Sequence, residues 1–158
     1  MGMNMILRRF DPVEAPATPG REAARFAHGF GHGADQRVLD MIQLWHPCNY
    51  LASGAVWADA LPENWLLGGT HWHAMHPDEE PPRVLSPQEV RAVRTHLDSL
   101  DEALLDERMQ HMASGRTGTY RAPTSREERA WTRDEYDRLT DFFRAAAEAD
   151  EAILKTVG

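Results

Sequence analysis

The pattern of apolar and polar residues predicts a strand at each end of the chain. The segment NMILRRF, residues 4–10, mixes apolar residues with arginines and stops at Asp11-Pro12. The segment AILKTV, residues 152–157, is rich in β-branched and apolar residues. Because these two strands enclose the helices between them, we expect them to share one small sheet.

Residues 11–35 are expected to be mostly loop, with one short helix over residues 20–27. Apolar residues then step by three and four positions over residues 36–52. We expect a helix there that is apolar around much of its circumference and lies near the centre of the domain. Asp35 can cap its start. Pro47 is expected to kink or break it, because the ring removes one backbone hydrogen bond.

Three further helices are predicted from capping boxes, in which a Ser or Thr is followed three residues later by Glu. The pairs are Ser86 with Glu89, Ser99 with Glu102, and Thr132 with Glu135. The second of these helices is expected to cover about residues 100–113, and the third to run to about residue 149. The pattern predicts a single α+β domain over residues 1–158. Its small sheet, including the N- and C-terminal strands, packs against three to four helices.

Composition and charge narrow the class of protein. The chain has 158 residues, of which 42% are hydrophobic and 27% charged, as in a folded soluble domain. No apolar run approaches the ~20 residues that span a membrane, and no signal peptide is visible. The formal net charge of −8 opposes nucleic-acid binding and suits a basic partner. The single cysteine, Cys48, excludes an intrachain disulfide and fits the cytoplasm.

Six segments, spread in order over nearly the whole chain, carry a family resemblance. They are the MGM start, VLDMIQLWHPCNYLASG, NWLLGG, RVLSPQEV, LDEALLDERMQHMASGRTGTY and YDRLTDFFRAAAEADEAILKTV. Together they resemble the YfbM-like family, a bacterial family of unknown function. The resemblance implies the family's fold and transfers no catalytic residue. Pro47 and the stretch THWHAMHPDEEPP depart from the family pattern, so the histidines in that stretch are not a family feature.

Those histidines, His71, His73 and His76, form the candidate metal site. In a strand, His71 and His73 point to the same side, and His76 can supply a third nitrogen. Three protein ligands and one open position are what catalytic zinc needs. With Glu79 as base, the cluster would make a metal-dependent hydrolase. The alternative is a solvated loop that binds a divalent metal only adventitiously.

Aromatic residues in the irregular middle of the chain form a candidate binding surface. They are Trp57, Trp65, Trp72 and His46. The tryptophans either contact a partner or a second copy of the chain in a homodimer, or pin a loop-rich segment to the core. His46 is either a core histidine bonded to a carboxylate such as that of Asp40, or a general acid–base group.

The sequence favours a non-enzymatic cytoplasmic protein that binds another protein, with a basic partner suited to its acidic charge. No catalytic triad or cofactor fingerprint is present, and neither nucleic acid nor a membrane is an expected partner. The alternative is the metal-dependent hydrolase at the three histidines, so whether the protein is an enzyme stays open. A sensor of small ligands, with a pocket near Trp45 and His46, is a third hypothesis.

Overall fold

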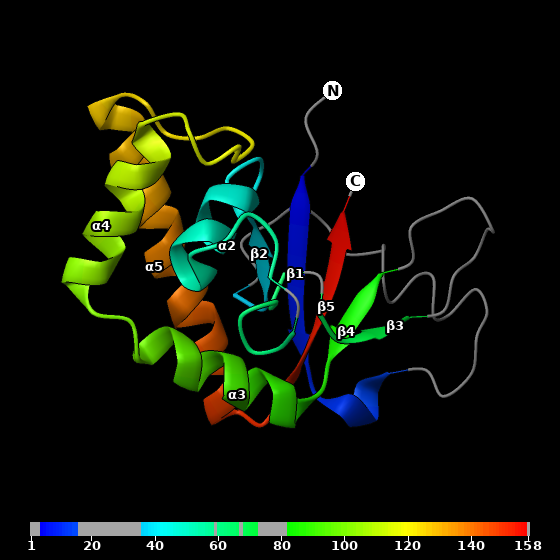
Figure 1. Cartoon of the computed structure of the whole chain (residues 1–158). Helices are drawn as coiled ribbons and strands as arrows, with labels where there is room; N and C mark the ends of the chain where they lie inside the picture. Colours follow the sequence, from blue (N-terminus) through cyan, green and yellow to red (C-terminus); the bar gives the residue numbers. More distant parts are fainter. Residues whose placement is uncertain (1–3, 16–35, 59, 67, 73–81, 158) are drawn as a thin grey trace.

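Five strands form one antiparallel sheet in the computed structural model, which describes residues 4–15, 36–58, 60–66, 68–72 and 82–157 (Figure 1). The strand order is β2-β1-β5-β4-β3. Their bounds are β1 Met5–Phe10, β2 Val38–Asp40, β3 Thr70–His71, β4 Arg83–Leu85 and β5 Ala152–Val157. The terminal strands are neighbours, with Met5 opposite Val157. The predicted α+β fold, with both terminal strands in the sheet, is confirmed.

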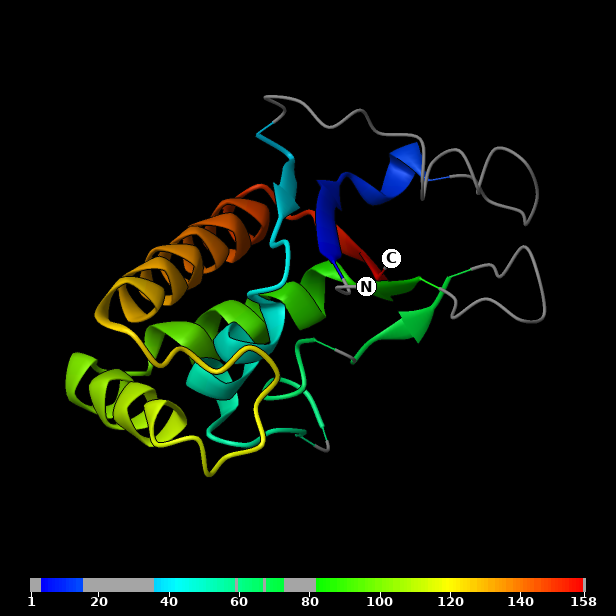
Figure 2. The same ribbon diagram turned by 90° about the horizontal axis from the view of Figure 1, so that it is seen from above.

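The four α-helices of the described part lie on one side of this sheet (Figure 2). They are α2 (Trp45–Ser53), α3 (Pro87–Asp98), α4 (Glu102–Ala113) and α5 (Arg126–Glu148). A short 3-10 helix, η1 (Pro12–Glu14), lies on the other side. No helix in the described ranges combines the length and apolar character needed to cross a membrane.

The central strand β5 contributes to a hydrophobic cluster on each face of the sheet. Ile153 joins the main core under the helices, which also holds the largest buried side chains of α2, α3 and α5. Leu154 points to the opposite face, where it packs with Phe10 and the partly buried Trp72. This alternation is the strand period of two, and β1 shows it as well, with Leu7 in the main core and Phe10 in the second cluster.

The predicted helix over residues 36–52 is wrong in its first half. Residues 38–40 form β2, which pairs with β1, and α2 begins only at Trp45. Pro47 therefore lies in the first turn of α2, where a backbone N–H has no acceptor within the helix, so the ring breaks no helical hydrogen bond. Asp35 and the predicted helix over 20–27 lie outside the described residues.

The capping box predicted at Ser86 is confirmed. Its hydroxyl accepts from the Glu89 N–H, and the Glu89 carboxylate accepts from the Ser86 N–H. The box predicted at Ser99 is wrong, because Ser99 ends α3 and the side chain of Asp101 caps α4 by accepting from the Leu104 N–H.

The third predicted capping box is also misplaced. The helix α5 begins nearly two turns earlier, at a box formed by Ser125 and Glu128. Thr132 is buried inside the helix, where its hydroxyl donates to the carbonyl oxygen of Glu128. The local pattern of Thr followed by Glu therefore occurs in the middle of a helix that another box has already started.

Candidate functional site

Four stacked aromatic rings connect α2 with two loops. His46 lies between Trp45 and Trp57, with ring-centroid distances of 5.1 Å and 4.8 Å. Trp45 in turn faces Tyr120, at a centroid distance of 6.3 Å. Neighbouring ring planes are inclined by 25–30°. We call these four residues, Trp57, His46, Trp45 and Tyr120, the aromatic column.

Backbone groups fix the ring of His46 within the column. Its Nδ1 lies 2.9 Å from the N–H of Tyr120, which donates to it. The ring proton must then be on Nε2, which donates to the carbonyl oxygen of Val56 at 3.2 Å. Burial lowers the pKa of His46, so the ring is neutral near pH 7. Since both nitrogens are engaged, His46 organises the column and has no nitrogen left for proton transfer.

These contacts correct the expected carboxylate partner of His46. The ring bonds to backbone groups of Val56 and Tyr120, and not to the carboxylate of Asp40. The interpretation of His46 as a core histidine otherwise agrees with the structure, because the residue is only 3% exposed.

The two ends of the column reach the solvent. Trp57 is 57% exposed and Tyr120 is 37% exposed, whereas Trp45 and His46 are buried. One face of the Trp57 indole covers His46, so the exposed area lies on its other face and edges. A large aromatic face that is both exposed and held in place by stacking can contact a partner with little loss of side-chain entropy.

The other tryptophans proposed for the binding surface lie elsewhere. Trp65 is fully buried, with its ring edge-on to Phe143 at 6.0 Å, so it supplies no area to a surface. Trp72 is partly buried against Phe10 on the opposite face of the sheet. These two residues pin irregular segments to the two clusters, which was the alternative interpretation.

The histidine cluster is described only in part. His71 is exposed in the two-residue edge strand β3. His73, His76 and Glu79 lie outside the described residues. Among the residues that the structure describes, no group of three or more His, Cys, Asp or Glu side chains is placed to hold a metal ion. The metal site therefore stays a prediction.

The single cysteine does not offer a reactive thiol. Cys48 is fully buried on α2, and burial raises the pKa of its thiol well above the usual value. The Sγ atom lies 3.8 Å from the carbonyl oxygen of Thr132, to which the thiol donates. A nucleophilic cysteine needs the opposite setting, an exposed and electropositive one that favours the thiolate.

A buried ammonium group is the feature that sequence reasoning missed. Lys155, the only lysine of the chain, is 3% exposed on β5. Its Nζ donates to the carbonyl oxygens of Trp65, Leu66 and Gly68, at 2.5, 3.0 and 2.7 Å. The signal was present, because Lys155 follows Ile153 by two residues and so shares its inward face.

Comparisons with known proteins place the chain in a family. The model of a domain of unknown function, DUF1877, matches residues 1–156. The chain belongs to the DUF1877 family. The DUF1877 fold seen here is similar to the crystal structure of YfbM from Escherichia coli, a protein of unknown function, with a TM-score of 0.64 and 15% identity. The match covers 98% of this chain and 99% of that one.

At this level of identity the likeness to YfbM shows the fold alone. The resemblance to the YfbM-like family is thereby confirmed, while the function of this DUF1877 protein is not indicated by the match. No curated protein matches the chain.

Proposed function

We propose that this DUF1877 protein is a non-enzymatic protein-binding module, and that the aromatic column contacts a basic segment of the partner. The observation that supports this function is the exposed face of Trp57, which is held rigid by stacking on His46. Tryptophan and tyrosine are the residue types that most often dominate binding energy at protein interfaces.

Charge favours an arginine- or lysine-bearing segment in that partner. The face of an indole attracts a cation, an interaction worth about 0.5–2 kcal/mol. The net charge of −8 adds long-range attraction for a basic protein. At the other end of the column, the exposed Arg121 follows Tyr120 directly and repels a cation. The Trp57 end is therefore the expected contact.

The test compares Trp57→Ala with Trp131→Ala. Trp131 is a matched control, because it is 64% exposed and is not part of the column. Wild-type and variant proteins are immobilised, proteins retained from a native lysate are identified, and the affinity of each purified candidate is measured at two salt concentrations.

We expect a basic partner whose affinity falls about tenfold or more in Trp57→Ala, and stays within about twofold in Trp131→Ala. Its affinity should also decrease at higher salt. A partner that is acidic, or that binds Trp57→Ala as tightly as the wild type, would contradict the proposed contact.

The metal-dependent hydrolase at His71, His73 and His76 stays the alternative. Metal analysis of protein purified without a histidine tag tests it directly. About one zinc ion per chain, lost on replacing the three histidines by alanine, would favour a built site. Protein that is free of metal after incubation with zinc and gel filtration would exclude it.

A further inference from the structure

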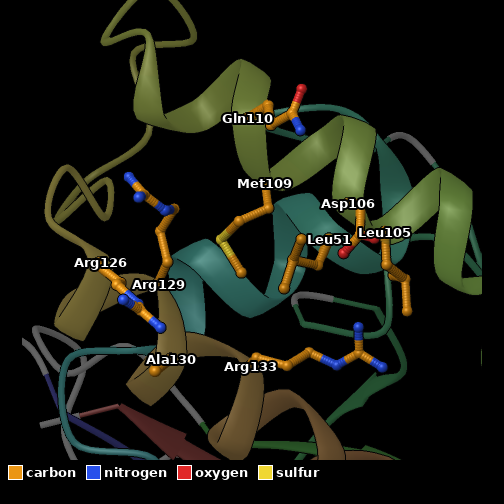
Figure 3. A pocket seen from close by; sticks show the side chains of 9 residues that line it. All are labelled: Leu51, Leu105, Asp106, Met109, Gln110, Arg126, Arg129, Ala130 and Arg133. Atoms are coloured by element: carbon orange, nitrogen blue, oxygen red, sulfur yellow. The ribbon is translucent and has the colours of Figure 1, made fainter.

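A cavity of about 300 Å³ lies between α2, α4 and α5 (Figure 3). Its apolar wall is formed by Leu51 of α2 and by Leu105 and Met109 of α4, with the Met109 side chain pointing toward α5. Leu51 and Leu105 also belong to the main hydrophobic core, so this wall is rigidly supported. No residue of the column lines the cavity.

Three arginines of α5 form the opposite wall: Arg126, Arg129 and Arg133. Their spacing of three and four residues places them on one face of the helix. Among the described residues that line the cavity, Asp106 is the one acidic residue, so this lining is net positive.

The three arginine side chains differ in the hydrogen bonds and ion pairs that they make within the protein. Arg133 is engaged by the carboxylates of Glu102 and Asp137. Arg129 donates through Nη1 to the carbonyl oxygen of Thr124 and has no carboxylate partner among the described residues. Within the same part of the chain, Arg126 has neither a hydrogen bond nor an ion pair from its side chain. Two guanidinium groups therefore keep free N–H donors beside an apolar wall.

We infer that this cavity binds a small amphipathic anion, with its carboxylate or phosphate head at Arg126 and Arg129. A guanidinium fork matches the two oxygens of such a head. The apolar body of the ligand would lie against Leu51, Leu105 and Met109. The volume is at the lower end for ligand sites, which are about 300–1,000 Å³, so the body is short.

A neighbouring cavity explains why the anion is confined to this end of α5. The second cavity, of about 420 Å³, shares Leu105 and Arg133 with the first. Its other charged lining residues are the acidic Asp98, Glu102, Asp137 and Asp141, and one arginine, Arg144. Arg133, held by its two carboxylates, separates the two cavities, and the acidic one repels an anion.

Binding is tested by calorimetric titration with octanoate, octyl phosphate, neutral 1-octanol and inorganic phosphate. We expect one or both amphipathic anions to bind about tenfold or more tightly than octanol and than inorganic phosphate, and the tighter of the two identifies the preferred head. Equal affinity for octanol and the anions, or no binding of either anion, would overturn the inference.

Two variants locate the site. Arg126→Gln removes a guanidinium group that makes no hydrogen bond or ion pair with the described residues, and it is expected to weaken anion binding about tenfold. Arg116→Gln is the control, since it removes the same charge from the exposed connection between α4 and α5 and does not line the cavity. Met109→Trp keeps every charge, fills the cavity, and should abolish binding of octyl phosphate. Equal weakening by Arg126→Gln and Arg116→Gln would indicate only a general charge effect and would refute the site.

Discussion

At His46, hydrogen bonds with the backbone determine which ring nitrogen carries the proton. An N–H from Tyr120 meets Nδ1 and a carbonyl oxygen from Val56 meets Nε2, so only the neutral ring with its proton on Nε2 satisfies both. Protonation of Nδ1 would set two N–H groups against each other. The imidazole is thus a fixed spacer between two indoles. The backbone contacts that hold it already occupy both of its nitrogens, so neither is available to exchange a proton with a substrate.

Lys155 shows the opposite case, a charged group held inside the protein. Three carbonyl oxygens can accept from an ammonium, whereas a neutral amine has only two N–H groups for them. Burial nevertheless lowers the pKa of Lys155 to about 7. The balance between these two effects makes this residue a source of pH dependence.

Stability is expected to rise with pH because of Lys155. An exposed lysine in the unfolded chain keeps its proton up to a pKa of about 10.4, so between about pH 7 and 10 the unfolded state binds more protons than the folded state. The free energy of unfolding should therefore increase through this window, by at most about 1.4 kcal/mol per pH unit. Urea unfolding of the wild type and of Lys155→Met measures it, and an equal slope in both proteins would rule out Lys155 as the cause.

At the scale of elements, the predicted helix starts succeeded only where the predicted residue is the one that caps the helix. The box at Ser86 was readable because Pro87 follows it at the first helical position. Ser99 and Thr132 carry the same local pattern, but one ends a helix and the other lies inside one. A four-residue pattern cannot distinguish the first turn of a helix from a later turn, because the choice depends on what the flanking residues pack against.

The cap of α5 is expected to contribute measurably to stability. Ser125→Ala removes the acceptor for the Glu128 N–H and should lower the free energy of unfolding by about 1 kcal/mol. Hydrogen bonds from Ser125 and Thr124 lower the pKa of Glu128 to about 2, so its half of the box stays charged at neutral pH. Chemical denaturation measures the change. Ser114→Ala, in an exposed position at the end of α4, is the control, and equal effects would argue against the cap.

Short strands and long-range pairs set the limit of the sequence-based predictions. The strands β2, β3 and β4 have only two or three residues, too few for an alternating pattern to stand out. Trp57 was identified as a surface candidate from its local composition. His46 was named with it, but Tyr120 was not, since Tyr120 meets His46 across 74 residues of sequence. No local pattern records a contact of that range.

At the scale of the whole molecule, β5 holds the structure together. It pairs with β1 on one side and β4 on the other, and its side chains enter both hydrophobic clusters. The terminal strands were predictable because each is six residues long and has four apolar residues. Their position in the middle of the sheet was not, since the strand order follows from pairings with short strands that the pattern does not reveal.

A charge in the middle of β5 should therefore destroy the fold. Ile153→Asp places an unpaired carboxylate in the main core, where Ile153 is fully buried, and we expect loss of the cooperative unfolding transition. Val157→Asp is the control on the same strand, because Val157 is 42% exposed, and it should change stability by less than about 0.5 kcal/mol. Circular dichroism during heating distinguishes the two, and a folded Ile153→Asp would contradict the central role of β5.

The pairing of Met5 with Val157 also constrains how the protein is made. The ribosome makes β1 and its neighbour β2 well before β5, the other neighbour of β1, which follows all the α-helices of the described part. Throughout that interval one edge of β1 can pair only with the three-residue strand β2 and the other edge lacks β5, and exposed strand edges are the condition under which nascent chains recruit chaperones. We expect closure of the sheet to be the late, slow event of folding, and a polypeptide released before its last strand to be degraded and not to accumulate.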